Sequence, residues 1–183
     1  MKRKSTKEIL ADSFRELAES KSIDKITVPD IVSNCGYSTA TFYRQFKDKY
    51  DLIAWDYTRD LERILSRADG NKSTWKQILS DASDYYDERK EYIRNLILHT
   101  SGYDSFIRYM VEINNEHLRK LILAAAGTGQ LSEKTEMSIR TYCLGTVALT
   151  CEWILGKYPV SKAALQEVYE VSMPKMLQEY LSQ

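Results

Sequence analysis

The sequence predicts an all-α protein, with three short helices at its amino-terminal end followed by a helical bundle. Apolar residues recur at spacings of three and four along most of the 183 residues, as on one face of an α-helix. Several such stretches are preceded by Ser or Thr with an acidic or amide residue three positions later, the pattern of a capping box. No stretch shows the alternating pattern of a half-buried strand.

The first helix is predicted to begin after Ser5, which can form a capping box with Glu8. Leu10, Phe14 and Leu17 follow at spacings of four and three, so they lie on one face of the helix. We expect that face to be buried.

Residues 27–49 have the layout of a helix-turn-helix, in which the second helix enters the major groove of DNA. Thr27 and Asp30 can form a capping box for the first of the two helices. Gly36 can adopt the positive φ that a tight turn needs, and Ser38 is placed to cap the second helix.

The second of these helices carries the side chains that we expect to contact DNA. Phe42 and Phe46 are four residues apart and would hold the helix to the core. Because the amino end of such a helix meets base edges, Thr39, Ala40 and Arg44 are expected to read bases. Hydroxyl, amide and ammonium groups near helix starts suit phosphates. The predicted DNA-binding residues are Thr27, Ser38, Thr39, Ala40, Thr41, Tyr43, Arg44, Gln45 and Lys49.

This segment resembles the amino-terminal domain of the TetR family of bacterial transcriptional regulators. The family has a hydroxyl residue opening its second helix, Gly at the turn, then Thr-Phe/Leu-Tyr-x-x-Phe and a polar link to Lys. Val32 and Cys35 stand where the family usually has Ala, so the two helices are expected to cross slightly further apart. The matching residues are Thr27, Ile31, Val32, Gly36, Thr41, Phe42, Tyr43, Phe46 and Lys49. The resemblance implies a homodimer that binds double-stranded operator DNA.

A fourth helix, capped by Asp48, is expected to end near residues 68–71, and in the resembled family this helix joins two domains. We therefore expect a helix-turn-helix domain at residues 1–50 and a helical effector-binding and dimerisation domain at residues 51–183. Next, a long helix is predicted from a capping box at Thr74 and Gln77 to Leu98, and another helix over residues 104–126.

The helix predicted from Ser132 to Leu155 is apolar on two faces, so both faces must be covered. Gly145 would allow a neighbouring helix to approach closely. A last helix is expected after Ser161, with a kink at Pro174. By resemblance these two helices pair with their copies in a second subunit, although periodicity alone also allows them to fill the core of one subunit.

Composition indicates the class of protein. Residues 1–50 hold 10 Lys and Arg against 7 Asp and Glu, and the rest holds 16 against 19. The excess of basic residues therefore lies at the end of the chain that holds the helix-turn-helix. No apolar stretch has the length of a transmembrane helix or the position of a signal peptide, so we expect a cytoplasmic protein without membrane contact. Three cysteines and two histidines show no metal-binding or nucleophile pattern. We therefore expect no enzyme activity, metal or cofactor.

Thirteen tyrosines and three tryptophans are the second functional signal. Many fall on helices that would surround the interior of the second domain, and aromatic walls with a few polar tips suit an apolar effector. The other interpretation of the same residues is an ordinary filled core. The predicted effector-binding residues are Tyr85, Tyr86, Tyr103, Phe106, Tyr109, Met110, Tyr142 and Trp153.

We therefore expect a transcriptional regulator, a repressor in our first interpretation, that binds a palindromic operator as a dimer. A small apolar or aromatic effector would change its affinity for DNA. The alternative is a regulator without a small-molecule pocket, controlled by a partner protein and acting as an activator. It follows from the short second domain and residues 51–55, which resemble a TetR-type branch that includes the activator of dihydroxyacetone kinase genes, whose members act through a protein co-regulator. The sequence leaves the operator and the effector open.

Overall fold

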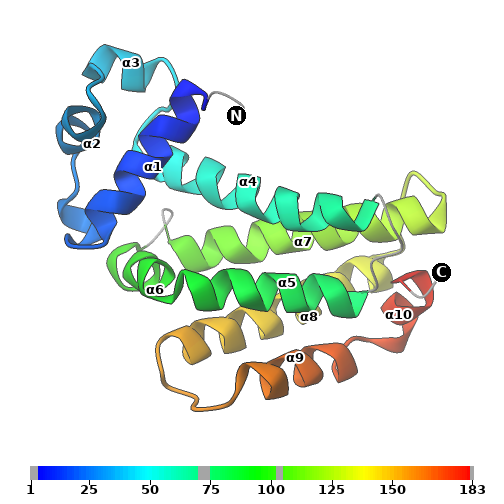
Figure 1. Ribbon diagram of the computed structural model, residues 1–183. Helices are drawn as coiled ribbons and strands as arrows, with labels where there is room; N and C mark the ends of the chain where they lie inside the picture. Colours follow the sequence, from blue (N-terminus) through cyan, green and yellow to red (C-terminus); the bar gives the residue numbers. More distant parts are fainter. Residues whose placement is uncertain (1–3, 70–74, 102–104, 182–183) are drawn as a thin grey trace.

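The computed structural model describes residues 4–69, 75–101 and 105–181, and within these ranges it is helical and has no strands. Figure 1 shows α1, α2 and α3 together at one end, and α4 leading away from them along a bundle that contains α5, α7, α8 and α9. The predicted all-α fold is confirmed. The helices are α1 (Thr6–Ala18), the 3-10 helix η1 (Ile23–Lys25), α2 (Val28–Cys35), α3 (Thr39–Tyr43), α4 (Lys49–Asp69), α5 (Trp75–Glu88), α6 (Lys90–His99), α7 (Phe106–Ala126), α8 (Glu133–Ile154), α9 (Lys162–Val171) and α10 (Lys175–Leu181).

The amino-terminal helices begin where the capping patterns predict. Ser5 Oγ accepts the Glu8 N–H at 3.3 Å, and the Glu8 carboxylate accepts the Ser5 N–H at 2.8 Å. Thr27 and Asp30 make the same reciprocal pair, at 3.3 and 2.8 Å. Gly36 has a φ of 73° and ends α2, because this left-handed conformation costs glycine little.

Asp48 begins α4 as predicted. Its Oδ1 accepts the N–H groups of Tyr50 and Asp51, both at 2.9 Å. The helix then packs against α1, α5 and α7. The predicted stop beyond Asp69 and the predicted cap at Thr74 lie outside the described residues.

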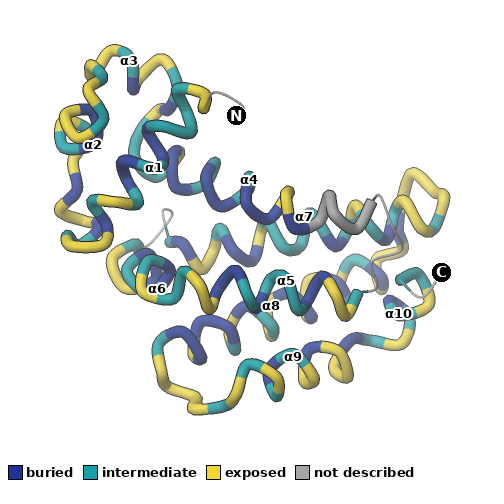
Figure 2. Tube along the Cα trace, in the orientation of Figure 1, coloured by how far each residue is buried: buried dark blue, intermediate teal, exposed yellow. Residues whose placement is uncertain are grey.

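Apolar side chains of the helix-turn-helix and of the bundle form one continuous core that extends from Leu10 and Phe42 to Trp153 and Leu165. Figure 2 shows that the sides of α1 and α4 that face each other are buried. The domain border at residue 50 therefore stays a prediction, since the core continues across it.

The helix predicted from residue 74 to residue 98 is wrong in one respect, because it is broken at Arg89, where φ is −115° and ψ is 22°. After this break, α6 packs against η1 and α8. The Asn95 side chain on α6 donates to the carbonyls of Ala18 and Lys21 and accepts the Ile23 N–H. These long-range contacts favour a change in the direction of the chain at Arg89, where the sequence has neither Gly nor Pro to indicate a break.

Pro174 separates α9 from α10, where a kink in one helix was predicted. A proline has no N–H to continue the helical ladder, and here the chain makes a full stop. The Leu177 N–H, which donates to the Pro174 carbonyl at 2.8 Å, begins the next helix.

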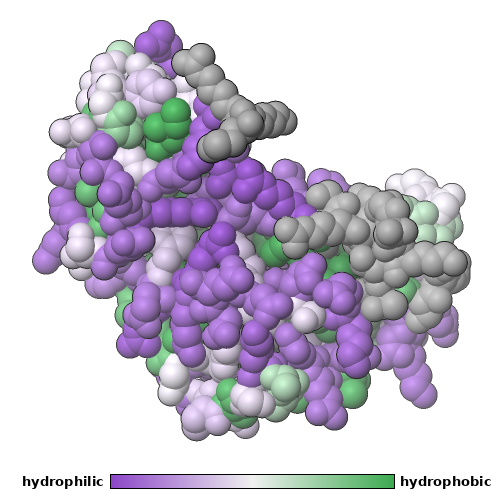
Figure 3. Space-filling model, in the orientation of Figure 1, coloured by the Kyte–Doolittle hydropathy of each residue, from purple (hydrophilic) through white to green (hydrophobic). Residues whose placement is uncertain are grey.

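Part of the apolar surface of α8 and α9 is uncovered in a single chain. Ile139 is buried on α8, but Leu144 is 46% exposed and Met137 is 70% exposed. Val171 on α9 is also 70% exposed. Figure 2 shows exposed residues along the outer side of α9, and in Figure 3 small hydrophobic areas lie along the lower edge, near α9, below a mostly hydrophilic face. Within the described ranges, no helix combines the length and the apolar character that crossing a bilayer requires.

Candidate functional site

The first candidate site is the exposed surface of α3, the predicted recognition helix. Phe42 and Phe46 hold this short helix to the core, with Phe46 packed against Trp55 at 5.6 Å between ring centroids. Tyr43 is 61% exposed. Of the other predicted DNA-binding residues, Thr27, Ser38, Thr39, Ala40 and Arg44 are exposed, whereas Thr41, Gln45 and Lys49 are half-buried.

Arg44 folds back along α3 in the absence of DNA. Its Nε donates to the Ala40 carbonyl at 3.3 Å and its Nη2 donates to Thr41 Oγ1 at 3.1 Å. A guanidinium has five N–H donors, so these two contacts leave enough donors for a bidentate pair with guanine. Both contacts are exposed, and their loss on turning toward DNA costs little.

Lys49 occupies a site that the sequence analysis did not foresee. Its ammonium donates to the carbonyls of Ile23 at 2.8 Å, Asp24 at 3.0 Å and Ile26 at 2.9 Å. These bonds fix η1 to the start of α4 and use all three hydrogens of the group. Burial lowers the pKa of Lys49. Its phosphate role stays a prediction, and it now requires one of these bonds to be exchanged for a phosphate oxygen.

An ion-pair cluster links α1 to α4. Arg15 Nε donates to Asp56 Oδ2 at 2.5 Å, and Arg15 Nη2 pairs with Asp60. Arg59 adds a bond to Asp56 at 2.8 Å. Burial raises the pKa of the Asp56 carboxyl, which is only 1% exposed. Burial by itself lowers the pKa of Arg15, but the two carboxylates outweigh it and raise that pKa.

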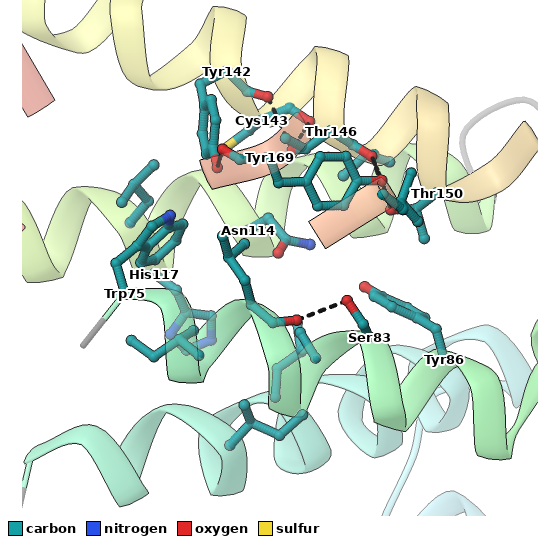
Figure 4. A pocket seen from close by; sticks show the side chains of 18 of the residues that line it. Trp75, Ser83, Tyr86, Asn114, His117, Tyr142, Cys143, Thr146, Thr150 and Tyr169 are labelled. Carbon is teal, nitrogen blue, oxygen red and sulfur yellow. Dashed lines mark hydrogen bonds between the residues drawn. The ribbon is translucent and has the colours of Figure 1, made fainter. Parts of the chain in front are cut away.

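The second candidate site is a cavity of about 80 Å³ in the bundle, shown in Figure 4. It runs between α5, α7 and α8 and is completed by residues of α4 and α9. No Asp, Glu, Lys or Arg of the described ranges lines it. The lining residues are Leu61, Ile64, Trp75, Ile78, Leu79, Ala82, Ser83, Tyr86, Asn114, His117, Leu118, Leu121, Tyr142, Cys143, Thr146, Val147, Thr150, Trp153, Leu165 and Tyr169.

Three of the predicted effector-binding residues, Tyr86, Tyr142 and Trp153, line this cavity. Tyr85, Phe106, Tyr109 and Met110 do not line it, and Tyr103 lies outside the described residues. Tyr85 instead lies under the Arg89 guanidinium at 4.7 Å, and the Phe106 ring packs against Tyr57 at 5.0 Å between centroids. Met110 contacts Cys151 at 3.9 Å between sulfurs. These residues build the core around the cavity.

The sequence analysis missed the polar residues of the cavity wall. Ser83, Asn114, His117, Thr146 and Thr150 bring polar groups to an interior that is lined mainly by apolar and aromatic side chains. Burial lowers the pKa of His117, so its imidazole is neutral at pH 7. In the sequence, polar residues inside helices with apolar periodicity were the available signal. Within the described residues, no cluster of His, Cys, Asp and Glu could hold a metal ion.

Comparison with known proteins gives two family matches. Residues 10–54 match the bacterial regulatory proteins of the tetR family, and residues 73–173 match a transcriptional regulator C-terminal region. The HTH-type dhaKLM operon transcriptional activator DhaS of Lactococcus lactis subsp. lactis is 23% identical over 101 residues, which are 55% of this chain and 54% of that protein. The chain thus matches about half the length of this curated relative.

Two solved structures share the fold. One is a dihydroxyacetone kinase operon activator DhaS, with a TM-score of 0.64, 20% identity and coverage of 97% of this chain and 96% of that one. The other is a TetR transcriptional regulator from Rhodococcus sp. RHA1, with a TM-score of 0.67, 15% identity and coverage of 92% and 95%. With a helix-turn-helix at one end and family matches over both parts, the chain belongs to the TetR family of transcriptional regulators.

Proposed function

We propose that this regulator binds a palindromic operator as a homodimer and that a small molecule in the bundle cavity changes its affinity for DNA. The cavity carries this proposal. Its walls are apolar and aromatic with a few polar groups, the usual make-up of small-molecule sites. Two of its lining residues, Leu61 and Ile64, belong to α4, the helix that continues from the helix-turn-helix.

Control through α4 requires a ligand with different affinities for two positions of that helix. The equilibrium shifts only by that difference, and operator DNA must then alter ligand affinity by the same factor. Arg15 supports a path through α4, because it ties α1 to Asp56 and Asp60. A change of tilt in α4 would therefore carry the helix-turn-helix with it.

The uncovered apolar residues of α8 and α9 support a dimer. A Cβ added at Gly145 would meet no atom of the described residues within 4 Å, so that part of the chain leaves the space beside it open. A twofold interface would place one self-complementary patch against its copy. Two reading helices on that axis would then contact half-sites about 34 to 36 Å apart.

A second candidate is an activator controlled by a partner protein. It is favoured by the names of the two DhaS relatives, both described as operon activators. In this version the cavity is a packing defect, and the partner binds the surface of α5 and α6. Figure 3 shows that this surface is mostly hydrophilic.

The experiment starts from a genomic footprint of the full-length protein, which gives the operator. Operator affinity is then measured with a small-molecule library and, separately, with cell extract. An affinity change caused by a small molecule and lost in Trp153→Ala, with unliganded DNA binding intact, supports the first candidate. Activity in extract alone, removed by surface substitutions on α5, supports the second. If neither shifts the affinity, the bundle serves only for dimerisation.

A further inference from the structure

The polar groups of the cavity have an excess of hydrogen-bond donors. The first is the indole Nε1 of Trp75, which is buried and has no hydrogen-bond partner in the part of the chain that the structure describes. The rings of Trp75 and Tyr142 are 6.2 Å apart, and the indole N–H interacts with the Tyr142 hydroxyl, which partly offsets the rise that burial causes in the pKa of Tyr142, but the contact does not meet hydrogen-bond geometry. A buried donor without an acceptor is costly, so a bound acceptor is favoured here.

The second excess donor comes from two tyrosines. The Tyr57 and Tyr86 hydroxyl oxygens are 2.6 Å apart, and Asn114 Nδ2 donates to Tyr57 Oη at 3.2 Å. The pair has two O–H groups but only one bond between them, and Asn114 acts toward both hydroxyls as a donor, so one of the two protons is left over. Tyr86 lines the cavity and Tyr57 lies behind it. If Tyr57 donates to Tyr86, the proton left over is that of Tyr86, on the residue that lines the cavity.

The remaining hydroxyl groups that line the cavity donate to backbone carbonyls. Tyr142 donates to the Tyr169 carbonyl at 2.7 Å, and Ser83 donates to the Leu79 carbonyl at 2.7 Å. Tyr169 donates to the Thr146 carbonyl at 2.9 Å. The wall therefore offers free donors without a charge to balance an ionic ligand.

The two free donors lie far apart along the cavity. Trp75 and Tyr86 are both on α5 and eleven positions apart, which is about 16 Å along the helix axis. Figure 4 shows Trp75 at one end and Tyr86 at the other, with Asn114 between them. The volume of about 80 Å³ corresponds to roughly six water-sized positions.

We propose that the cavity binds an uncharged, narrow, largely apolar molecule whose carbonyl-type oxygen accepts a hydrogen bond from the Tyr86 hydroxyl. This inference rests on the proposed small-molecule control and specifies its ligand class. No Asp, Glu, Lys or Arg of the described ranges lines the cavity, and a carboxylate would have only the His117 imidazole to pair with, so an ionic ligand is disfavoured there. An alkane of the same length would leave the Tyr86 proton without an acceptor. The Trp75 N–H offers a second position to a water or to a longer ligand.

The test measures the binding of four probes of equal chain length to the full-length protein without DNA: 2-heptanone, heptane, heptanoate and heptylammonium. Intrinsic fluorescence reports binding, because Trp75 and Trp153 both line the cavity. We expect 2-heptanone to bind best and both ions to bind at least tenfold more weakly. Tyr86→Phe should weaken 2-heptanone about two- to twelvefold and leave heptane unchanged. Retained heptane binding also shows that this variant is folded.

Tyr85→Phe is the matched control, since it removes a buried hydroxyl from the next residue, which does not line the cavity. It should leave the ratio of 2-heptanone to heptane affinity unchanged. The ligand class is wrong if an ion binds as well as the ketone, if no probe binds at millimolar concentration, or if Tyr86→Phe leaves that ratio unchanged. A ketone that binds with this selectivity but does not change operator affinity supports the ligand class and refutes small-molecule control.

Discussion

Loss of Arg15 is expected to be among the most destabilising single changes at the surface between α1 and the bundle. Arg15→Ala leaves the Asp56 and Asp60 carboxylates in place, although they are 1% and 6% exposed. Breaking a buried ion pair by removing one partner typically costs about 3 to 5 kcal/mol, because a charge remains without compensation. Arg59 still contacts Asp56 at 2.8 Å, and Arg59, Arg63 and Arg89 stay at 3.6, 3.5 and 3.9 Å from Asp60, so we expect the lower end, about 3 kcal/mol.

Thermal unfolding followed by circular dichroism measures this cost. For a chain of this size, about 3 kcal/mol lowers Tm by roughly 6 to 12 °C. The control is Lys4→Ala, which breaks an exposed ion pair with Asp12 and should cost at most about 1 kcal/mol. Asp60→Asn in the Arg15→Ala background should restore part of the loss, because it removes one of the two buried carboxylates that have lost the Arg15 charge. Equal Tm changes in Arg15→Ala and Lys4→Ala would refute this account of the cluster.

Three further outcomes are expected. Arg44→Ala should relax sequence preference at one position of each half-site at a cost of about 1 to 3 kcal/mol, measured on single-base operator variants, and an unchanged preference profile would contradict base reading by Arg44. Bonds from Lys21, then from the Thr27 N–H and hydroxyl, lower the pKa of Asp30 to about 2, so the stability that its charge contributes is present above pH 4 and is lost as pH falls toward 2. The difference in Tm between the wild type and Asp30→Asn should therefore shrink over that pH range. A constant difference would show that the charge of Asp30 is not the source of this stability. Leu144→Glu should place a charge in the uncovered face of α8 and give monomers in sedimentation at micromolar concentration while circular dichroism stays helical; a dimer of unchanged affinity would move the interface elsewhere.

Local chemistry made the helix starts predictable. Ser5, Thr27, Ser38 and Asp48 each cap a helix through a residue two or three positions later, and such a pair is fully visible in the sequence. The break at Arg89 was not visible, because the contacts that favour it join residues far apart. Asn95, for example, bonds to Ala18, Lys21 and Ile23. The role of Lys49 was hidden for the same reason, since the carbonyls that it binds belong to η1 and to Ile26 directly after it.

The cavity wall was predicted only in part, because composition does not reveal the rotation of a helix. Tyr85 and Tyr86 are adjacent and both buried, yet only Tyr86 lines the cavity. Consecutive residues of a helix point about 100° apart, and α5 is packed on several sides, against α4, α6 and α9. Periodicity therefore identifies both tyrosines as interior without separating a cavity wall from ordinary packing.

Two of the side-chain attachments between the helix-turn-helix and the bundle lead to the cavity. Arg15 fixes α1 to α4, which supplies Leu61 and Ile64 to the wall. Asn95 on α6 fixes the end of α1 and η1, and the neighbouring Arg94 donates to the Leu155 carbonyl at 3.1 Å, directly after the α8 segment that contains Trp153. A ligand that separated α4 from α8 would pull on both attachments at once. Because packed helices shift between discrete arrangements more readily than they deform, we expect such a ligand to move the reading helix as a unit, which in the proposed dimer changes the distance between the two reading helices.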